Sequence, residues 1–346
     1  MLSRKQFIEL TNKKGIWKKN ELKIICSSLN LNPNGNKKIL YSNIKTYFNI
    51  KPYELLADWN VNDLKIYLKK RGLSTKGNKK VLFQKMKHFK NMNGGKKPTY
   101  SVVSYQAQGK RQYMEDRIII KLNKTNCFFS ILDGHGGSQC ANFMKKNLYP
   151  IFVLEKKKFK NDIQKSLLNT YLKADNLFLK QNVKSGSTAC SLFIDNNTKK
   201  FYVANTGDSR IILYDNNRII QLSIDHKPDS PKEQHRIYRT GGFVKYGRLN
   251  GILAMSRSLG DINLKGNGLS CLPDIISGNI KKQLKYFIIA SDGLYDVMSN
   301  SDIINFINKN LNRGVPKKEI VKKLVDYAIS YKGSSDNVSA IIIFKN

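Results

Sequence analysis

Acidic side chains are scarce in this sequence. Its 346 residues include 25 Asp and Glu against 61 Lys and Arg, which gives a formal net charge of +36. A positive field of this size favours nucleic acid, an anionic membrane surface or an acidic protein as a partner. Lys, Asn and Ile are also used heavily along the whole chain, so the charge has a second, purely compositional explanation. Because carboxylates are few, the position of each one carries information.

Cysteines and long apolar runs are scarce as well. The cysteines number five, an odd count, and they are scattered and never spaced as Cys-x-x-Cys. This excludes a disulfide framework and a zinc finger, and it predicts a reducing compartment. No apolar run approaches the roughly 20 residues that cross a bilayer. The N-terminal MLSRKQFIELTNKK is charged where a signal peptide would be apolar. We expect an intracellular protein without membrane insertion.

Glycine and proline mark one boundary, in the segment NMNGGKKP. Paired glycines, a proline and no apolar periodicity predict a linker over 93–99. Residues 1–100 contain 23 Lys and Arg but 5 Asp and Glu, more than twice the net charge density of the remainder. The boundary therefore separates a strongly basic N-terminal region from a larger domain predicted over 100–346.

The basic region contains an internal repeat with an offset of 42 residues. ELKIICSSLNLNPNGNKKILYSNIKTY begins at Glu21, and DLKIYLKKRGLSTKGNKKVLFQKMKHF begins at Asp63. Each copy has a helical apolar pattern, a Gly-Asn-Lys-Lys turn and a second helical pattern. We predict two helix-loop-helix hairpins, one in 1–50 and one in 51–92, forming a small all-α region.

The second hairpin resembles the SAP motif, a helix-extended loop-helix module that binds DNA. The resemblance covers LKIYLKKRGLSTKGNKKVLFQKM, residues 64–86. The first hairpin is a weaker copy, with Asn30 in place of Gly72 and Pro33 in place of Thr75. The resemblance implies DNA contacts from basic residues near the loop: Arg71, Lys79 and Lys80, with Lys37 and Lys38 at the equivalent positions of the first hairpin. The alternative is an arm for protein or a membrane surface, with merely solvated lysines.

From Tyr100 onward, short runs of apolar and β-branched residues predict strands. These runs cover 117–122, 127–132, 187–194, 200–205, 210–214, 286–291 and 338–344. Helical patterns lie between them at 138–148, 161–181, 301–311 and 316–331. Strands interrupted by helix pairs predict an α+β fold, with two sheets in a sandwich and helices outside.

The acidic residues of this domain lie at the ends of predicted strands. A single Asp-Gly is ordinarily only a turn, but five such places recur: Asp133, Asp208, Asp292, Asp336 and the pair Glu115 and Asp116. Strand ends of a sandwich converge on a common cleft, where carboxylates repel one another unless cations are bound. Oxygen ligands without cysteine or a histidine cluster favour Mg²⁺ or Mn²⁺.

The motifs RQYMED, LDGHGG, SGSTA, NTGDSR, DHKP, LNGILAMSRSLGD, SDGLYDVM and SDNVS follow one another in this order. Their order resembles that of the type 2C (PPM) protein phosphatases, metal-dependent enzymes that hydrolyse phosphoserine and phosphothreonine in proteins. The resemblance implies two antiparallel sheets in a sandwich flanked by helix pairs. It also implies two tightly bound ions, Mg²⁺ or Mn²⁺, and a weaker third ion.

The resemblance assigns a role to each matching residue. Asp133 is expected to bridge two ions. Arg111 is expected to bind the substrate phosphate, and His135 is expected to act as general acid. The other metal-site residues are Asp292 and Asp336 for one ion, Glu115 and the carbonyl of Gly134 for the other, Asp116 for a water ligand, and Asp208, Asp292 and Asp296 for the third ion.

Two alternatives remain open for the whole chain. A pseudophosphatase or scaffold would have lost metal ligands, whereas every ligand position is filled here, so we expect an active, monomeric phosphatase.

The residues Gly186 to Thr188 are expected to let a strand pack closely, and Asp261 is expected either to support the site or to be structural. If the N-terminal region binds DNA, the enzyme is expected in a nucleus or a viral replication site, and otherwise in the cytoplasm.

Overall fold

The chain divides into two units, Met1–Lys97 and Pro98–Asn346. The computed structural model describes residues 7, 11, 18–29, 31–34, 36–47, 61–69, 74–85 and 99–346. Arg71 and most of the predicted linker 93–99 lie outside the described residues. The predicted boundary between residues 50 and 51 does so too and stays a prediction.

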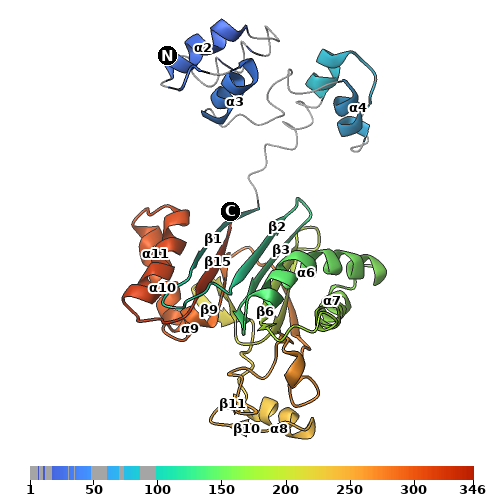
Figure 1. Cartoon of the computed structure of the whole chain (residues 1–346), viewed down its shortest axis with the longest axis vertical. Helices are drawn as coiled ribbons and strands as arrows, with labels where there is room; N and C mark the ends of the chain where they lie inside the picture. The colour runs from blue at the N-terminus through green and yellow to red at the C-terminus, as the bar shows by residue number, and fades with distance from the viewer. Residues whose placement is uncertain are drawn as a thin grey trace. The chain divides into compact units, whose positions relative to one another are not determined.

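The described part of the first unit is helical (Figure 1). It contains α2 (Lys19–Ser28), α3 (Lys37–Tyr47), α4 (Val61–Lys69) and a further helical segment over 79–85. Helices α2 and α3 share a small apolar core made of Phe7, Leu22, Ile25, Cys26, Leu29, Leu40 and Ile44. In the second hairpin Leu64, Leu68, Leu82 and Phe83 are also buried, which agrees with the helix-loop-helix pattern of the repeat.

The second helix of each hairpin begins in the same way. Asn36 Oδ1 accepts a hydrogen bond from the Ile39 N–H at 3.0 Å. Asn78 Oδ1 accepts one from the Val81 N–H at 3.1 Å. Asn is a favoured N-cap because its side chain satisfies a backbone N–H group that has no partner inside the helix. The offset of 42 residues therefore relates the two hairpins in structure as well as in sequence.

The second unit is built on two five-stranded sheets whose neighbouring strands are all antiparallel. The first sheet has the order β1 (Tyr100–Ala107), β15 (Val338–Lys345), β14 (Leu284–Ala290), β8 (Arg210–Asp215) and β9 (Arg218–Gln221). The second has the order β13 (Asp274–Asn279), β7 (Lys200–Thr206), β6 (Ala189–Asp195), β3 (Asn126–Leu132) and β2 (Arg117–Leu122).

The apolar strands are buried on both faces because each sheet lies between the other sheet and a helix pair. In β15, Ile341 and Ile343 point into the core between the sheets. Ala340, Ile342 and Phe344 of the same strand pack toward α10 (Asn300–Asn312) and α11 (Lys317–Ser330). Helices α6 (Gln139–Lys158) and α7 (Ile163–Leu179) cover the second sheet (Figure 1). This confirms the predicted sandwich flanked by helix pairs.

Several short elements lie at the ends of the long strands. Strands β12 (Leu259–Gly260), β5 (Gly186–Ser187) and β4 (Gly134–His135) form a small antiparallel sheet. Helix α8 (Pro231–Arg239) and the hairpin of β10 (Val244–Lys245) and β11 (Arg248–Leu249) lie together away from the two helix pairs (Figure 1). The 3-10 turn η3 (Ile262–Leu264) follows β12, and α9 (Asp292–Tyr295) follows β14. Gly134 and His135 belong to β4, Asp292 begins α9, and Asp261 directly follows β12.

Candidate active site

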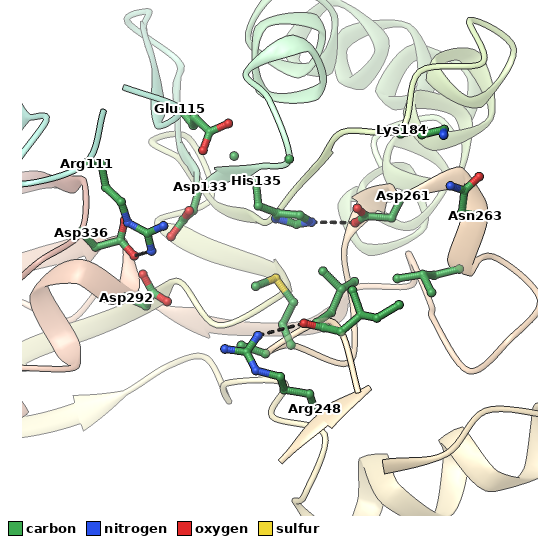
Figure 2. A pocket seen from close by; sticks show the side chains of 17 residues that line it. Arg111, Glu115, Asp133, His135, Lys184, Arg248, Asp261, Asn263, Asp292 and Asp336 are labelled. Carbon is green, nitrogen blue, oxygen red and sulfur yellow. Dashed lines mark hydrogen bonds and ion pairs between the residues drawn. The ribbon is translucent and has the colours of Figure 1, made fainter. Parts of the chain in front are cut away.

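A pocket of about 560 Å³ opens where these short elements meet. It brings together seven of the residues predicted for the site: Arg111, Glu115, Asp133, Gly134, His135, Asp292 and Asp336. Figure 2 shows Asp133 between the Arg111–Asp336 ion pair on one side and the His135 ring on the other. The segments that supply them are far apart in the sequence, so the fold creates this cluster.

Asp133 is held in place by Thr188 of the SGST motif. Its backbone N–H donates to Thr188 Oγ1 at 3.0 Å, and its carbonyl accepts from the Thr188 N–H at 2.8 Å. Thr188 Oγ1 also lies 2.9 Å from Ser209 Oγ, beside Asp208. The small, polar side chains of this motif thus connect two of the acidic loops.

The loop that carries Glu115 is fixed by Asn337, next to Asp336. Asn337 Oδ1 accepts from the Glu115 N–H at 2.7 Å, and its Nδ2 donates to the carbonyls of Gln108 and Tyr113 at 2.8 and 3.0 Å. At Gly134, an added Cβ would lie 2.6 Å from the Glu115 carbonyl oxygen. Glycine is therefore required for the DG turn to approach the Glu115 loop this closely.

The carboxylates at the base of the site destabilise one another. Asp116 is 1% exposed, and neither of its carboxyl oxygens has a hydrogen-bond partner among the described residues. Burial raises the pKa of Asp116 to about 6, and burial together with Asp208 raises the pKa of Asp292 to about 7. The pKa of Asp133 is also raised, first by burial and then by Asp116 and Asp292. A bound cation would offset both burial and repulsion, because it favours the charged form of each carboxylate.

The donor set fits a hard divalent cation, because it consists of carboxylate and carbonyl oxygens. Within the described part of the chain, however, no three His, Cys, Asp or Glu side chains gather closely enough to hold an ion. Several of the acidic groups instead have protein partners. Arg111 Nη2 lies 2.6 Å from Asp336 Oδ2, and Lys227 Nζ lies 2.6 Å from Asp208 Oδ2. Arg111 and Lys227 are thus the cations with which a metal ion would compete.

Three of the predicted metal-site residues do not line the pocket. Asp116 and Asp208 are buried outside its lining, and Asp208 Oδ1 has no hydrogen-bond partner in the described chain. Asp296 is exposed directly after α9. Burial raises the pKa of Asp296, and Lys227 partly offsets that effect. The structure therefore gives the proposed third ion a less enclosed surrounding than the other two.

The residues predicted to bind DNA belong to the first unit. Lys37, Lys38 and Lys80 are exposed at the start of the second helix of each hairpin, and Lys79 is half-buried. Arg71 lies outside the described residues. The four described lysines are accessible to a polyanion, and their role stays a prediction.

The pocket also contains residues that the sequence did not single out. Lys184, Arg248 and Asn263 contribute polar groups, and Ile252 and Met255 contribute apolar surface. The Arg248 guanidinium donates from Nη1 to the Ile252 carbonyl at 2.8 Å. Lys184 and Arg248 gave no signal in the sequence, because each is one basic residue among 61.

His135 reaches across the pocket to Asp261, the residue that follows β12. Its Nε2 lies 2.7 Å from Asp261 Oδ2 (Figure 2). Burial lowers the pKa of His135, but the hydrogen bond and charge of Asp261, together with the charges of Asp208 and Glu115, more than offset burial and leave that pKa above its usual value. The imidazole is thus placed as a proton donor would be.

Comparison with known protein families gives two matches. The family model described as protein phosphatase 2C matches residues 100–338. The SAP domain model matches residues 56–89. The second match covers one of the two repeats, and α2 and α3 lie outside it.

Relatives with similar sequences cover most of the chain. Probable protein phosphatase 2C 54 of Oryza sativa subsp. japonica is 32% identical over 274 residues, which are 73% of this chain and 75% of that protein. Protein phosphatase 1L of Bos taurus is 35% identical over 270 residues, 72% of this chain and 73% of that protein.

Solved structures share the fold. Serine-threonine phosphatase 2C from Toxoplasma gondii superposes with a TM-score of 0.65 at 24% identity, covering 72% of this chain and 96% of that one. A C. elegans sex determining protein superposes with a TM-score of 0.66 at 22% identity, covering 88% of this chain and 92% of that one.

Proposed function

Since the chain belongs to the protein phosphatase 2C family and is a protein phosphatase, we propose that it hydrolyses phosphoserine and phosphothreonine with a water activated by two Mg²⁺ or Mn²⁺ ions. The observation that carries this proposal is the pocket itself. Asp133, Asp292, Asp336 and Glu115 meet there with a guanidinium and an imidazole. This set can bind cations, bind a phosphate and supply a proton.

The carboxylates would hold the ions. Asp133 would contact both, Asp292 and Asp336 would complete one site, and Glu115 with the Gly134 carbonyl would complete the other. Asp116 would accept a hydrogen bond from a water ligand, and Asp208 with Asp292 and Asp296 would take a third, weaker ion. Two divalent ions that share a water lower its pKa, so that hydroxide is available near neutral pH.

Arg111 is the phosphate-binding residue in this proposal. Its side chain is 57% exposed at the edge of the pocket, and Asp336 fixes one end of the guanidinium at 2.6 Å. The remaining N–H groups form a planar fork that matches two phosphate oxygens. Arg111 therefore orients the phosphate against the carboxylate cluster, in line for attack by water.

His135 is the proton donor. The alkoxide of serine or threonine is a strong base, so its departure requires a proton. The imidazole lines the same pocket as Arg111 and Asp133, on the side opposite Arg111 (Figure 2). Water attack from the carboxylate side and proton delivery by His135 together complete hydrolysis.

The test is phosphate release from a phosphothreonine peptide. Chain treated with EDTA should be inactive, and Mg²⁺ or Mn²⁺ should restore activity. Asp133→Asn should remain inactive at every metal concentration while folding normally. Full activity in EDTA would refute the metal-dependent mechanism.

The proposal extends to targeting by the N-terminal unit, which would bind DNA and bring the enzyme to DNA-associated phosphoproteins in a nucleus or a viral replication site. Three features support this extension: the SAP match, the positive charge and the exposed lysines at equivalent helix starts. Helix N-termini with adjacent lysines favour phosphate oxygens. Two weak modules on one chain would bind more tightly than either alone.

Fluorescence anisotropy with duplex DNA tests the targeting. The affinity of the full chain should fall as salt rises, with a slope of about −0.9 in log K against log salt for each phosphate contact. The pair Lys79→Glu and Lys80→Glu should weaken binding most, and the pair Lys37→Glu and Lys38→Glu should weaken it less. Absence of binding at low salt would instead assign the N-terminal unit to a protein partner.

A further inference from the structure

The His135–Asp261 pair is built by the small three-stranded sheet. His135 ends β4, Asp261 directly follows β12, and β5 lies between these two strands. Their Nε2–Oδ2 distance of 2.7 Å joins residues 126 positions apart. The sheet therefore places an acidic partner against the imidazole on the side away from Asp133 (Figure 2).

Gly186 of β5 leaves the space in which the two side chains meet. A Cβ at this position would overlap both His135 Nε2 and the Asp261 carboxyl group. Gly186 pairs with His135 on one side and with Gly260 on the other. The glycine of the SGST motif is thus explained by the His135–Asp261 contact, as well as by close strand packing.

Asp261 is held rigidly, in a conformation that has an energetic cost. Its backbone has φ +54° and ψ +51°, the left-handed region that non-glycine residues rarely adopt. Its N–H donates to the Ser185 carbonyl at 3.1 Å, and Ser258 Oγ donates to its Oδ2 at 2.5 Å. The preceding Gly260 N–H donates to Asp175 Oδ1 of α7 at 2.7 Å. The surroundings therefore fix the carboxylate where it faces His135.

The opposite nitrogen of the imidazole is enclosed by the protein. His135 Nδ1 is buried and has no hydrogen-bond partner among the described residues, so Asp261 is the side chain that holds the ring by a hydrogen bond. With Nε2 engaged by a carboxylate, the stable neutral tautomer carries its hydrogen on Nε2 and leaves Nδ1 bare. The same arrangement of carboxylate and imidazole fixes the tautomer and ring orientation in hydrolases of other folds.

We propose that Asp261 is a positioning residue for the reaction: its contact with Nε2 fixes the orientation in which the His135 ring delivers a proton to the leaving group. This inference rests on the proposed role of His135 as general acid and deepens it. As the phosphorus–oxygen bond to the leaving group breaks, its electron pair goes to the serine or threonine oxygen. One N–H bond of the imidazolium breaks and that oxygen gains the proton, which leaves a neutral imidazole beside Asp261.

The test compares two substrates in the full chain. A phosphothreonine peptide has a leaving group that needs a proton, whereas the p-nitrophenolate of p-nitrophenyl phosphate needs none. Asp261→Ala should lower kcat on the peptide by roughly 10-fold or more and leave kcat on p-nitrophenyl phosphate within about 2-fold. Asp261→Asn keeps a hydrogen-bond acceptor and should recover part of the loss. The exposed Asp326→Ala on α11 serves as a control and should change neither rate.

A double-mutant comparison separates positioning from general structural damage. In a His135→Ala background, Asp261→Ala should have no further effect on the peptide, because there is no ring left to orient. Gly186→Ala, which crowds the pair directly, should reproduce the peptide-selective loss and provides a second route if Asp261→Ala folds poorly. Thermal unfolding of each variant reports its folding.

Two results would overturn the proposal. Asp261 would have only a structural role if Asp261→Ala lowered kcat equally on the two substrates. The same would follow if the losses of kcat in Asp261→Ala and His135→Ala multiplied in the double variant. If His135→Ala itself shows no peptide-selective loss, the general acid assignment fails together with this inference. A peptide-selective loss in His135→Ala without one in Asp261→Ala would refute the inference alone and leave the proposed function intact.

Discussion

Single carboxylates decide both the chemistry and the stability of this phosphatase. Burial raises the pKa of Asp116, Asp133 and Asp292, and the charges of neighbouring carboxylates raise each of them further. Asp116 also lacks hydrogen-bond partners in the described chain. Such a cluster destabilises the fold unless it is protonated or bound to cations. The acidic cluster therefore lowers the stability of the fold when it is ionised and no cation is bound, although the proposed function requires it.

This cluster predicts how the EDTA-treated chain responds to pH. Asp116 and Asp292 have folded-state pKa values of about 6 and about 7, above the unfolded value of 3.8. Their protonation stabilises the fold below pH 3.8, and that contribution is lost as pH rises through about 6 and 7. The melting temperature in EDTA should therefore fall between about pH 5 and about pH 8.

Two comparisons make this pH prediction specific. Saturating Mn²⁺ should flatten the dependence, and Asp292→Asn should reduce it without added metal. Glu233, whose pKa is lowered to about 2 by Arg257 and its other hydrogen-bond donors, titrates below this interval. A melting temperature that rises over the interval would contradict the burial of these carboxylates.

Arg111 gives a second prediction for a single residue. Its guanidinium is exposed and, in the proposed mechanism, binds phosphate in the ground state as well as the transition state, so Arg111→Ala should raise KM more than it lowers kcat. Arg111→Lys should rescue only part of the loss, because an ammonium group lacks the planar fork. Steady-state kinetics on a phosphothreonine peptide measures both constants. A loss confined to kcat would place Arg111 in the chemical step instead.

Among the secondary-structure elements, the doubly buried strands were the most predictable from sequence. The run VSAIIIF predicts a strand over 338–344, and β15 covers Val338–Lys345 with every residue buried except Lys345. A strand that packs on both faces needs a continuous apolar run, which short-range patterns reveal. The acidic residues at the strand ends could be found for the same reason, since each interrupts such a run.

Elements that depend on distant contacts could not be predicted. The two-residue strands β4, β5 and β12 have no pattern of their own, so the His135–Asp261 contact was hidden. The predicted helix over 138–148 was too short, because α6 continues through Pro150 to Lys158. A proline removes only one N–H donor, and the burial of Ile151 and Phe152 beyond it keeps the helix in place.

Helix α7 provides a test of how the second sheet is anchored. The Tyr171 hydroxyl is fully buried and lies 2.9 Å from the Ala204 carbonyl of β7 and 2.8 Å from Ser191 Oγ of β6. Tyr171→Phe should cost about 1–3 kcal/mol in the free energy of unfolding, because buried polar atoms lose their partner. Urea denaturation measures this change. Tyr149→Phe, with an exposed hydrogen bond to Asn123, is the control and should cost about 0.5 kcal/mol or less. Equal costs would contradict the anchoring role of Tyr171.

In the whole molecule, the candidate active site and the proposed DNA-binding residues belong to separate units. Every residue that lines the described pocket belongs to Pro98–Asn346. Deleting residues 1–97 should therefore leave kcat on p-nitrophenyl phosphate within about 2-fold of the full chain. The same deletion should abolish DNA binding in the anisotropy assay. A large loss of kcat would show that the first unit contributes to the active site.

The charge density and the repeat in the sequence predicted this division into two units. They did not predict how one unit interacts with the other. The repeat places Lys37 and Lys38 at the same helix position as Lys79 and Lys80, and the structure reproduces that equivalence through Asn36 and Asn78. What the lysines bind depends on a partner outside the chain. Composition alone therefore leaves DNA and protein partners open.

The mechanism depends above all on whether divalent ions bind between the carboxylates of the pocket. X-ray diffraction at the manganese absorption edge, from crystals of the chain soaked in MnCl₂, locates such ions directly. We predict two anomalous peaks in the pocket, both within coordination distance of Asp133. Crystals of Asp133→Asn should lose at least one of these peaks. Saturating Mn²⁺ with no peak at the Asp133 carboxylate would contradict the two-ion site.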